Sequence, residues 1–384
     1  MIPRRLATIF LAAFAALLLA APAMAETARR KVIIDDEGFG LMHVMLLEDP
    51  EVEVLGLTTL SGNVWLNRAT AYALRGLEIM GRSDVPVVPG AKFPLLNSEA
   101  LTDRWEALYG KLTWKGAWMK QWVEPTRQST PPYRGADDPV DLPWGNPATR
   151  PRDEIAANYL IRMVRAHPGE ITIIAGGPLT NLALAQRLDP EFAGLVKELI
   201  YMGGSFNPHQ VLDNRSAAEF AREFANSPRR EFNMRFDPEA ASIVSRSPWR
   251  KLTVVPVDPS TGTQLTPALV ARLTRAARPA VAGLVGRYEL GFPLWDEIAA
   301  AVWLDPGVVT RHETLRVDYN TQFGPGYGDT LSWHAAYAPG LGEQSAQVVQ
   351  AVDARRMEDL IVRLLEAGAA RHKQASDAAP VPAP

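Results

Sequence analysis

The 384-residue sequence contains no cysteine. This absence excludes disulfide bonds, thiolate nucleophiles and zinc sites of the cysteine type. It also suits an oxidising compartment, where stray thiols are a liability. Any chemistry must therefore come from carboxylates, amides and hydroxyls.

The chain also lacks an excess of either charge. It has 40 Lys and Arg against 43 Asp and Glu, a formal net charge of -3. Such a balance offers no broad positive surface for nucleic acid, so we expect no polyanionic partner. The composition, 47% hydrophobic and 22% charged, is that of an ordinary globular protein with a large core.

Long apolar runs are scarce, and the main one lies at the start. Arg4 and Arg5 precede the apolar stretch Leu6–Ala20, and the small-residue motif Ala23-Met24-Ala25 follows it. This order is typical of a secretion signal cleaved near Ala25. The alternative, an uncleaved anchor, is disfavoured because the run is shorter than the ~20 residues that span a bilayer. We expect an exported, periplasmic protein with no stable membrane anchor.

Beyond the signal, β-branched runs alternate with helix-like stretches. This alternation predicts an α/β domain over residues 26–367, with an open, mainly parallel sheet flanked by helices around a Rossmann-like core. The expected strands are Lys31–Ile34, Val52–Leu60, Val85–Val88, Ile171–Ala175, Glu198–Met202 and Leu252–Val257. The expected helices are Asn67–Met80, Ile155–Arg165, Ala240–Val244 and Pro267–Arg278.

Two segments depart from this alternation. Residues 97–152 carry tryptophans among Gly, Pro and polar residues without a clear period, which indicates a lid or an insertion, or a surface excursion packed on the body. The tryptophans are Trp105, Trp114, Trp118, Trp122 and Trp144. Residues Gly368–Pro384 are rich in Ala and Pro, so we expect a disordered tail.

Polar residues follow the predicted strands at the edge where open α/β sheets bind ligands. Singly, each has a structural explanation, such as a turn, a helix cap or core packing. Their joint placement after consecutive strands favours a binding site instead. The segments are Asp35-Asp36-Glu37-Gly38, Ser61-Gly62-Asn63, Gly176–Asn181, Met202-Gly203-Gly204, Glu231–Asn233 and Trp295-Asp296-Glu297.

The sequence resembles the inosine-uridine preferring nucleoside hydrolases over most of residues 31–310. The most specific matches are Val54–Asn63 and Gly177–Ala185. Further matching stretches are Val32–Pro94, Gly176–Leu188, Tyr201–Gly204, Glu231–Ala240 and Trp295–Pro306. The resemblance implies a calcium ion at the pocket floor that holds the ribose diol and a water. An acid deprotonates this water, which attacks C1′ through an oxocarbenium-like state.

The resemblance also implies roles for individual residues. Asp35, Asp36 and Glu37 supply the catalytic acids, and Asp36, Glu37, Asp296 and the Gly176 carbonyl supply the metal ligands. The residues expected to bind substrate are Asn63, Met202, Glu231, Asn233, Trp295 and, if a one-residue gap is accepted, Asn226. Oxygen donors and carboxylates agree with a hard cation, a sugar diol and positive charge at C1′.

Three departures stand out. The family pattern Asp-x-Asp-Pro-Gly-x-Asp-Asp is represented by residues 35–42, which lack the closing aspartate pair, so either Asp36 or Glu37 takes the base position. Nearby His43 is either a substitute polar partner or a structural residue. Trp295 replaces a histidine that protonates the leaving base in some members, and stacking between Trp295 and a lid tryptophan, or solvent protonation, is then needed. The third departure is an insertion at residues 207–226.

The first hypothesis is an exported enzyme that hydrolyses the N-glycosidic bond of a ribonucleoside or related riboside, giving ribose and free base. The second is a riboside-binding protein that has lost competent calcium chemistry. A two-lobed periplasmic receptor fits the signal, but no second sheet pattern is visible. Family members commonly form dimers or tetramers, so a homo-oligomer is possible.

Overall fold

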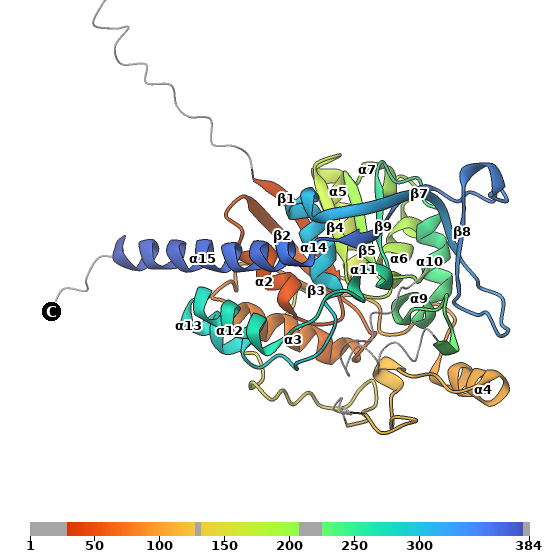
Figure 1. Ribbon diagram of the computed structural model, residues 1–384, viewed down its shortest axis with the longest axis horizontal. Helices are drawn as coiled ribbons and strands as arrows, with labels where there is room; N and C mark the ends of the chain where they lie inside the picture. Colours follow the sequence, from red (N-terminus) through yellow and green to blue (C-terminus); the bar gives the residue numbers. More distant parts are fainter. Residues whose placement is uncertain (1–28, 127–131, 207–224, 379–384) are drawn as a thin grey trace, which may run out of the picture.

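A computed structural model describes residues 29–126, 132–206 and 225–378. A nine-stranded sheet runs through this part of the chain in the order β3-β2-β1-β4-β5-β6-β9-β7-β8 (Figure 1). Its strands are β1 (Arg30–Asp36), β2 (Val52–Thr59), β3 (Val87–Pro89), β4 (Ile171–Ala175), β5 (Glu198–Met202), β6 (Leu252–Val255), β7 (Val309–Tyr319), β8 (Thr330–Trp333) and β9 (Ser345–Val352). The pairs from β3 through β6 to β9 are parallel, whereas β7 is antiparallel to β8 and β9.

Helices cover both faces of the sheet (Figure 1). The longer ones are α2 (Leu41–Glu48), α3 (Leu66–Ile79), α4 (Glu99–Tyr109), α5 (Ala156–Ala166), α6 (Thr180–Leu188), α10 (Pro238–Ser245), α12 (Pro267–Ala276), α13 (Pro279–Val285), α14 (Asp296–Leu304) and α15 (Ala354–Ala378). The shorter ones are α7 (Phe192–Leu195), α9 (Phe232–Phe236), α11 (Val257–Ser260) and the 3₁₀ turns η1 (Gly116–Trp118), η2 (Pro306–Val308) and η3 (Ala335–Tyr337).

Alternation along the strands divides the core into two layers. On β1, Val32 and Ile34 join one cluster with residues of α2, α3 and α12 to α15, whereas Ile33 joins the other with residues of α5, α6, α7 and α10. Successive side chains of a strand point to opposite faces, so a sheet covered on both sides needs apolar residues throughout. This requirement explains why the β1 run is continuously apolar.

The functional edge follows from the topology. The chain builds β1, β2 and β3 outward in one direction and then returns to add β4, β5 and β6 on the other side of β1. The switch between these halves lies between β1 and β4, where Asp35 is in register with Ala175. A crevice at such a switch point is where open α/β sheets bind ligands.

The predicted fold class is confirmed: a mainly parallel sheet flanked by helices. The six predicted strands and four predicted helices are present. Strands β4 and β5 have the predicted bounds, and the other elements have shifted ends. The chain leaves β6 at Val255 because Val257 begins α11. Sequence reasoning missed β7, β8 and β9. These strands pair with one another, and β9 also pairs with β6. Pairing between strands that are distant in the chain is not visible in a short stretch of sequence.

We expected a disordered tail from Gly368 onward. This prediction is wrong as far as Ala378, because helix α15 continues to that residue. Its alanines are strong helix formers that extend a helix already docked on the domain. Gly368 is buried against Glu48, and the Arg371 guanidinium donates to the Glu48 carbonyl at 2.5 Å. Figure 1 shows the far part of α15 extending beyond the body of the domain.

The Trp-rich segment is also more regular than expected. It contains helix α4, whose first turn is capped by Ser98, which accepts a hydrogen bond from Leu101 N. Trp105 and Trp118 are buried, so part of the segment packs on the body. The predicted signal peptide and most of the predicted insertion at residues 207–226 lie outside the described residues. In the described part of the chain, none of the helices combines the length and apolarity needed to cross a bilayer.

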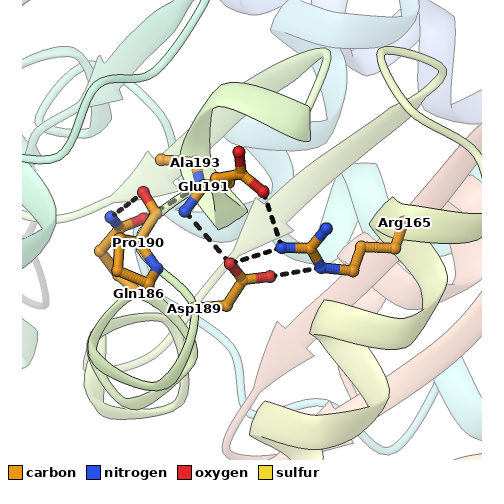
Figure 2. A network of polar contacts seen from close by, with 6 residues as sticks. All are labelled: Arg165, Gln186, Asp189, Pro190, Glu191 and Ala193. Atoms are coloured by element: carbon orange, nitrogen blue, oxygen red, sulfur yellow. Dashed lines mark hydrogen bonds and ion pairs between the residues drawn. The ribbon is translucent and has the colours of Figure 1, made fainter.

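A polar network joins helices α5, α6 and α7 near the starts of strands β4 and β5. Arg165, at the end of α5, binds Asp189 through two hydrogen bonds of 2.7 and 2.8 Å and Glu191 at 2.9 Å (Figure 2). Gln186 donates to the Pro190 carbonyl and accepts from Ala193 N. A bidentate arginine pair is geometrically specific, so this network fixes the turn from α6 to α7.

Candidate functional site

Asp35 is the penultimate residue of strand β1 and a fully buried carboxylate. Its Oδ1 accepts hydrogen bonds from Thr58 Oγ1 at 2.6 Å and from Asn181 Nδ2 at 2.7 Å. Its Oδ2 is buried without a hydrogen-bond partner. Burial raises the pKa of Asp35 to about 6, although the two donors oppose the shift. One oxygen of this side chain is therefore left for a ligand.

Asp36 lies next to His43 of helix α2. Its Oδ1 accepts from Glu37 N at 2.7 Å, and its Oδ2 lies 3.6 Å from His43 Nε2. Burial, with repulsion from Asp35 and Glu297, raises the pKa of Asp36 to about 7. Burial lowers the pKa of His43 to about 3, so its ring is neutral.

The tautomer of His43 follows from its other contact. Gly40 N donates to His43 Nδ1 at 3.1 Å, so the ring hydrogen is on Nε2 and faces Asp36. His43 also stacks on Phe39 with ring centroids 4.8 Å apart. His43 is thus both a packed structural residue and a polar partner, because its ring also presents a donor to the acid cluster.

Glu37 is joined to the turn after β2. Its Oε1 accepts from Asn63 Nδ2 at 2.7 Å, and its buried Oε2 has no hydrogen-bond partner. Glycines on two turns make this position possible: a Cβ on Gly62 would lie 2.7 Å from Glu37 Cδ, and one on Gly177 would lie 1.9 Å from Oε2. Burial and then repulsion from Asp36 raise the pKa of Glu37 well above its usual value.

Glu231 and Asn233 are positioned by the short helix α9, beside the end of β5. The Glu231 carboxylate caps this helix, accepting from Asn233 N, Met234 N and Gly204 N at 2.8 to 3.1 Å. Asn233 Nδ2 donates to the Gly176 carbonyl at 2.8 Å and to the Met202 carbonyl at 3.2 Å. Asn233 therefore ties the ends of β4 and β5 together.

Asp296 begins helix α14 and belongs to the same electrostatic cluster. Burial raises its pKa well above the usual value, and repulsion from Asp36, Glu297, Glu37 and Glu231 adds to the shift. Its neighbour Glu297, which lies in a predicted site segment but was given no role, has its pKa raised to about 7 by burial. The repulsion indicates that Asp296 lies near Asp36, Glu37 and Glu231, and the role assigned to it stays a prediction.

Trp295 and Asn226 lie at the margins. The Trp295 ring packs edge-on against Phe292, with centroids 5.9 Å apart. Asn226 is exposed and lines a cavity of about 610 Å³ together with Trp105, Trp114 and Arg230. Within the described residues, no hydrogen bond links Asn226 to the acid cluster.

The donor chemistry fits a hard cation. Asp35 Oδ2 and Glu37 Oε2 are buried acceptors without donors, and the acids beside them raise one another's pKa. Among the described residues, His43 is the one basic side chain within ion-pair distance of Asp35, Asp36 or Glu37. The described residues hold no group of three or more Asp, Glu, His or Cys side chains already arranged to enclose a metal.

Sequence reasoning missed several residues that shape the site. Asn181 lies in a quoted motif, but its amide was not assigned to Asp35, to which it donates. Trp114 was counted with the lid, although its indole N–H donates to Asn63 Oδ1 at 2.6 Å. Residues 51 positions apart carry no local signal of contact, whereas the Gly-Pro-Leu-Thr-Asn motif was available as a signal for Asn181.

Comparison with known proteins gives a consistent result. The family model described as inosine-uridine preferring nucleoside hydrolase matches residues 32–359. An uncharacterized protein of Schizosaccharomyces pombe is 30% identical over 342 residues, which cover 85% of this chain and 82% of the other. A probable uridine nucleosidase of Arabidopsis thaliana is 35% identical over 224 residues, covering 58% of this chain and 57% of that protein.

Bacterial relatives and solved structures agree. A pyrimidine-specific ribonucleoside hydrolase of Escherichia coli O157:H7 is 26% identical over 324 residues, covering 79% of this chain and 87% of that protein. A solved plant nucleoside hydrolase superposes with a TM-score of 0.63 at 27% identity, covering 88% of this chain and 99% of the other. An inosine-guanosine nucleoside hydrolase, at 20% identity and a TM-score of 0.65, shares the fold; it covers 88% of this chain and 99% of that chain.

Proposed function

Since this chain belongs to the inosine-uridine preferring nucleoside hydrolase family and is an N-ribosyl hydrolase, we propose the role of each site residue in the reaction. The substrate is a ribonucleoside or related riboside, and the products are ribose and free base. The observation that carries the proposal is the hydrogen-bonded cluster at the switch point, where Asn63 donates to Glu37 and Asn233 donates to the Gly176 carbonyl. A carboxylate-rich pocket stabilises the positive charge that develops at C1′.

We assign the general base to Glu37 and leave Asp36 as its electrostatic neighbour. Asp36 Oδ1 already accepts from the backbone, whereas Glu37 keeps one oxygen without a donor and holds Asn63 with the other. The raised pKa of Glu37 also strengthens it as a base. Glu37 then removes the proton from the attacking water, while Glu231, Asn233 and Asn63 hold the sugar.

The residues that fit a calcium ion are Asp36, Glu37, Asp296 and the Gly176 carbonyl, with Asp35 Oδ2 as a further acceptor. When bound, calcium would neutralise the clustered charge and bind the sugar diol and the water. The chain's own contribution is to hold these oxygens ready on turns anchored by Asn181 and Asn233.

Position 295 has no titrating side chain that could protonate the leaving base, so other groups must assist its departure. Indole has no titratable proton, so Trp295 contributes an aromatic surface. The cavity of about 610 Å³ with Trp114 on its wall offers a place for a planar base. Protonation of the leaving base then comes from solvent.

The test combines activity with metal content. We expect purified protein to release ribose from inosine or uridine and to bind about one calcium per chain. Glu37→Gln, Asp296→Ala and Glu231→Ala should each lower kcat/KM by about 10²-fold or more, because each removes a contact to the transition state. Near-normal activity in all three variants would show that the pocket is misplaced.

The binding-protein hypothesis is favoured by one observation. Leu41 and Met42, which stand at the place of the family's closing aspartate pair, are buried apolar residues of helix α2. A panel of nucleosides without turnover or calcium uptake, but with ribosides that raise the melting temperature, would establish this alternative.

We also propose that the protein is exported after cleavage near Ala25, on the basis of the basic, apolar and small-residue order of the first 25 residues. Amino-terminal sequencing of protein recovered from the periplasmic fraction tests this. A mature chain that begins at Met1 in the cytoplasmic fraction would refute it.

A further inference from the structure

A chain of two hydrogen bonds links the Trp-rich segment to the acid cluster. The indole N–H of Trp114 donates to Asn63 Oδ1 at 2.6 Å, and Asn63 Nδ2 donates to Glu37 Oε1 at 2.7 Å. The backbone N–H of Asn63 points to the same Glu37 oxygen at 3.4 Å. Trp114 therefore reaches Glu37 through one amide.

The direction of this chain is fixed by chemistry. An indole N–H can only donate, so the amide atom that faces Trp114 must be its oxygen. The amide NH₂ of Asn63 is then left for Glu37, which as a carboxylate can only accept. If the amide turned by 180°, its NH₂ would face the indole N–H, and neither group could accept a hydrogen bond. The indole thus selects the amide orientation in which the NH₂ faces Glu37.

The position of the indole is itself held by the backbone around it. Arg235 donates to the Trp114 carbonyl at 2.5 Å, and Ala117 N donates to the Gly62 carbonyl at 2.9 Å. Gly116 adopts φ +57°, and a Cβ there would lie 2.4 Å from the Gly62 carbonyl oxygen. This close docking fixes the segment on the turn that carries Asn63.

We propose that Trp114 is a positioning residue: its indole N–H holds the Asn63 amide in the orientation that presents a donor to Glu37. The proposal rests on the hydrolase function, with Glu37 as base. It gives the Trp-rich segment a task in positioning Asn63. Trp114 acts through Asn63, so its effect must vanish when Asn63 is absent.

The experiment is a double-mutant cycle with Trp114→Phe and Asn63→Ala. Phenylalanine keeps an aromatic ring and removes the N–H, and Asn63 is exposed, so neither change opens the core. We expect Trp114→Phe to lower kcat about tenfold, the effect of one hydrogen bond to a polar group, with a smaller change in KM. In the Asn63→Ala background the same change should have little further effect.

A matched control is Trp144→Phe, the same substitution in the same segment. Trp144 is also half-buried, but its ring packs edge-on against Tyr72, with centroids 5.6 Å apart. We expect kcat of this variant to match that of the wild type. An equal fall in kcat on Trp114→Phe in both backgrounds, or a fall of the same size in Trp144→Phe, would overturn the proposal.

A second measurement does not depend on turnover. In ¹⁵N-labelled protein, the indole N–H of Trp114 should be protected from hydrogen exchange, and Asn63→Ala should remove this protection. If wild-type protein hydrolyses no nucleoside, the function proposed above fails, and this measurement still decides on the hydrogen bond. Loss of protection supports the contact, whereas an unprotected indole in wild type refutes it.

Discussion

Replacing Asp35 by Asn should change how stability depends on pH, in a direction that the structure determines. Burial raises the pKa of Asp35 from 3.8 to about 6, so the fold prefers its neutral form. A raised folded-state pKa contributes stability that is present at low pH and lost as pH rises through about 6. The amide of Asn is neutral throughout, so the variant does not show this loss.

The magnitude follows from the size of the shift. About two pKa units, at ~1.4 kcal/mol each, correspond to about 3 kcal/mol, of which about 2 kcal/mol falls above pH 4.5. The variant also places an amide NH₂ where Asp35 Oδ2 has no hydrogen-bond partner. That cost of roughly 1–3 kcal/mol lowers the free energy of unfolding of the variant by the same amount at every pH. It therefore does not change how the difference between the two proteins depends on pH.

The assay is urea unfolding of both proteins from pH 4.5 to 8, with a chelator present to remove cations. The free energy of unfolding of Asp35→Asn minus that of wild type should increase by about 2 kcal/mol between pH 4.5 and 7 and then level off. A difference that stays flat across this range would refute the argument, since Asp35 would then titrate alike in the folded and unfolded chain.

Further predictions concern close approaches, packing and metal. Gly177→Ala should lower kcat/KM by more than tenfold in a ribose-release assay, because its Cβ would lie 1.9 Å from Glu37 Oε2; unchanged activity would contradict the geometry. Gly116→Ala should lower both the melting temperature and kcat, because φ +57° and the Gly62 carbonyl leave no room for a methyl group; a variant with wild-type values in both would count against this docking. Trp118→Ala should cost about 3–5 kcal/mol in urea unfolding because its ring is buried, and a cost under 1 kcal/mol would argue against this packing. At pH 8 the melting temperature should be higher with added calcium than with a chelator. Equal melting temperatures under the two conditions would exclude a cation at the acid cluster.

The sequence by itself determined the parallel half of the fold and most of the site. Continuous β-branched runs such as Ile171–Ala175 have one stable environment, a strand buried on both faces, and alternation with helices makes the sheet parallel. Because parallel strands end at the same edge, the acids at the end of β1 had to lie near Gly176, which follows β4. Motif order along the chain also indicated the family, which the comparisons confirm.

Tertiary structure alone decided how the acids differ from one another. Asp35, Asp36 and Glu37 are consecutive acids, and only the folded chain gives Asn181 to the first, His43 to the second and Asn63 to the third. These partners come from separate elements, and a side chain's environment depends on which elements pack against it.

The same reason explains the segments that were misjudged. The Trp-rich stretch has no period, so its sequence did not reveal that Trp114 reaches the site. The end of α15 was expected to be disordered because it is rich in Ala and Pro, yet as far as Ala378 it continues a helix that is already docked. Local composition reports what a segment can do alone, whereas contacts between distant residues decide what it does in the protein.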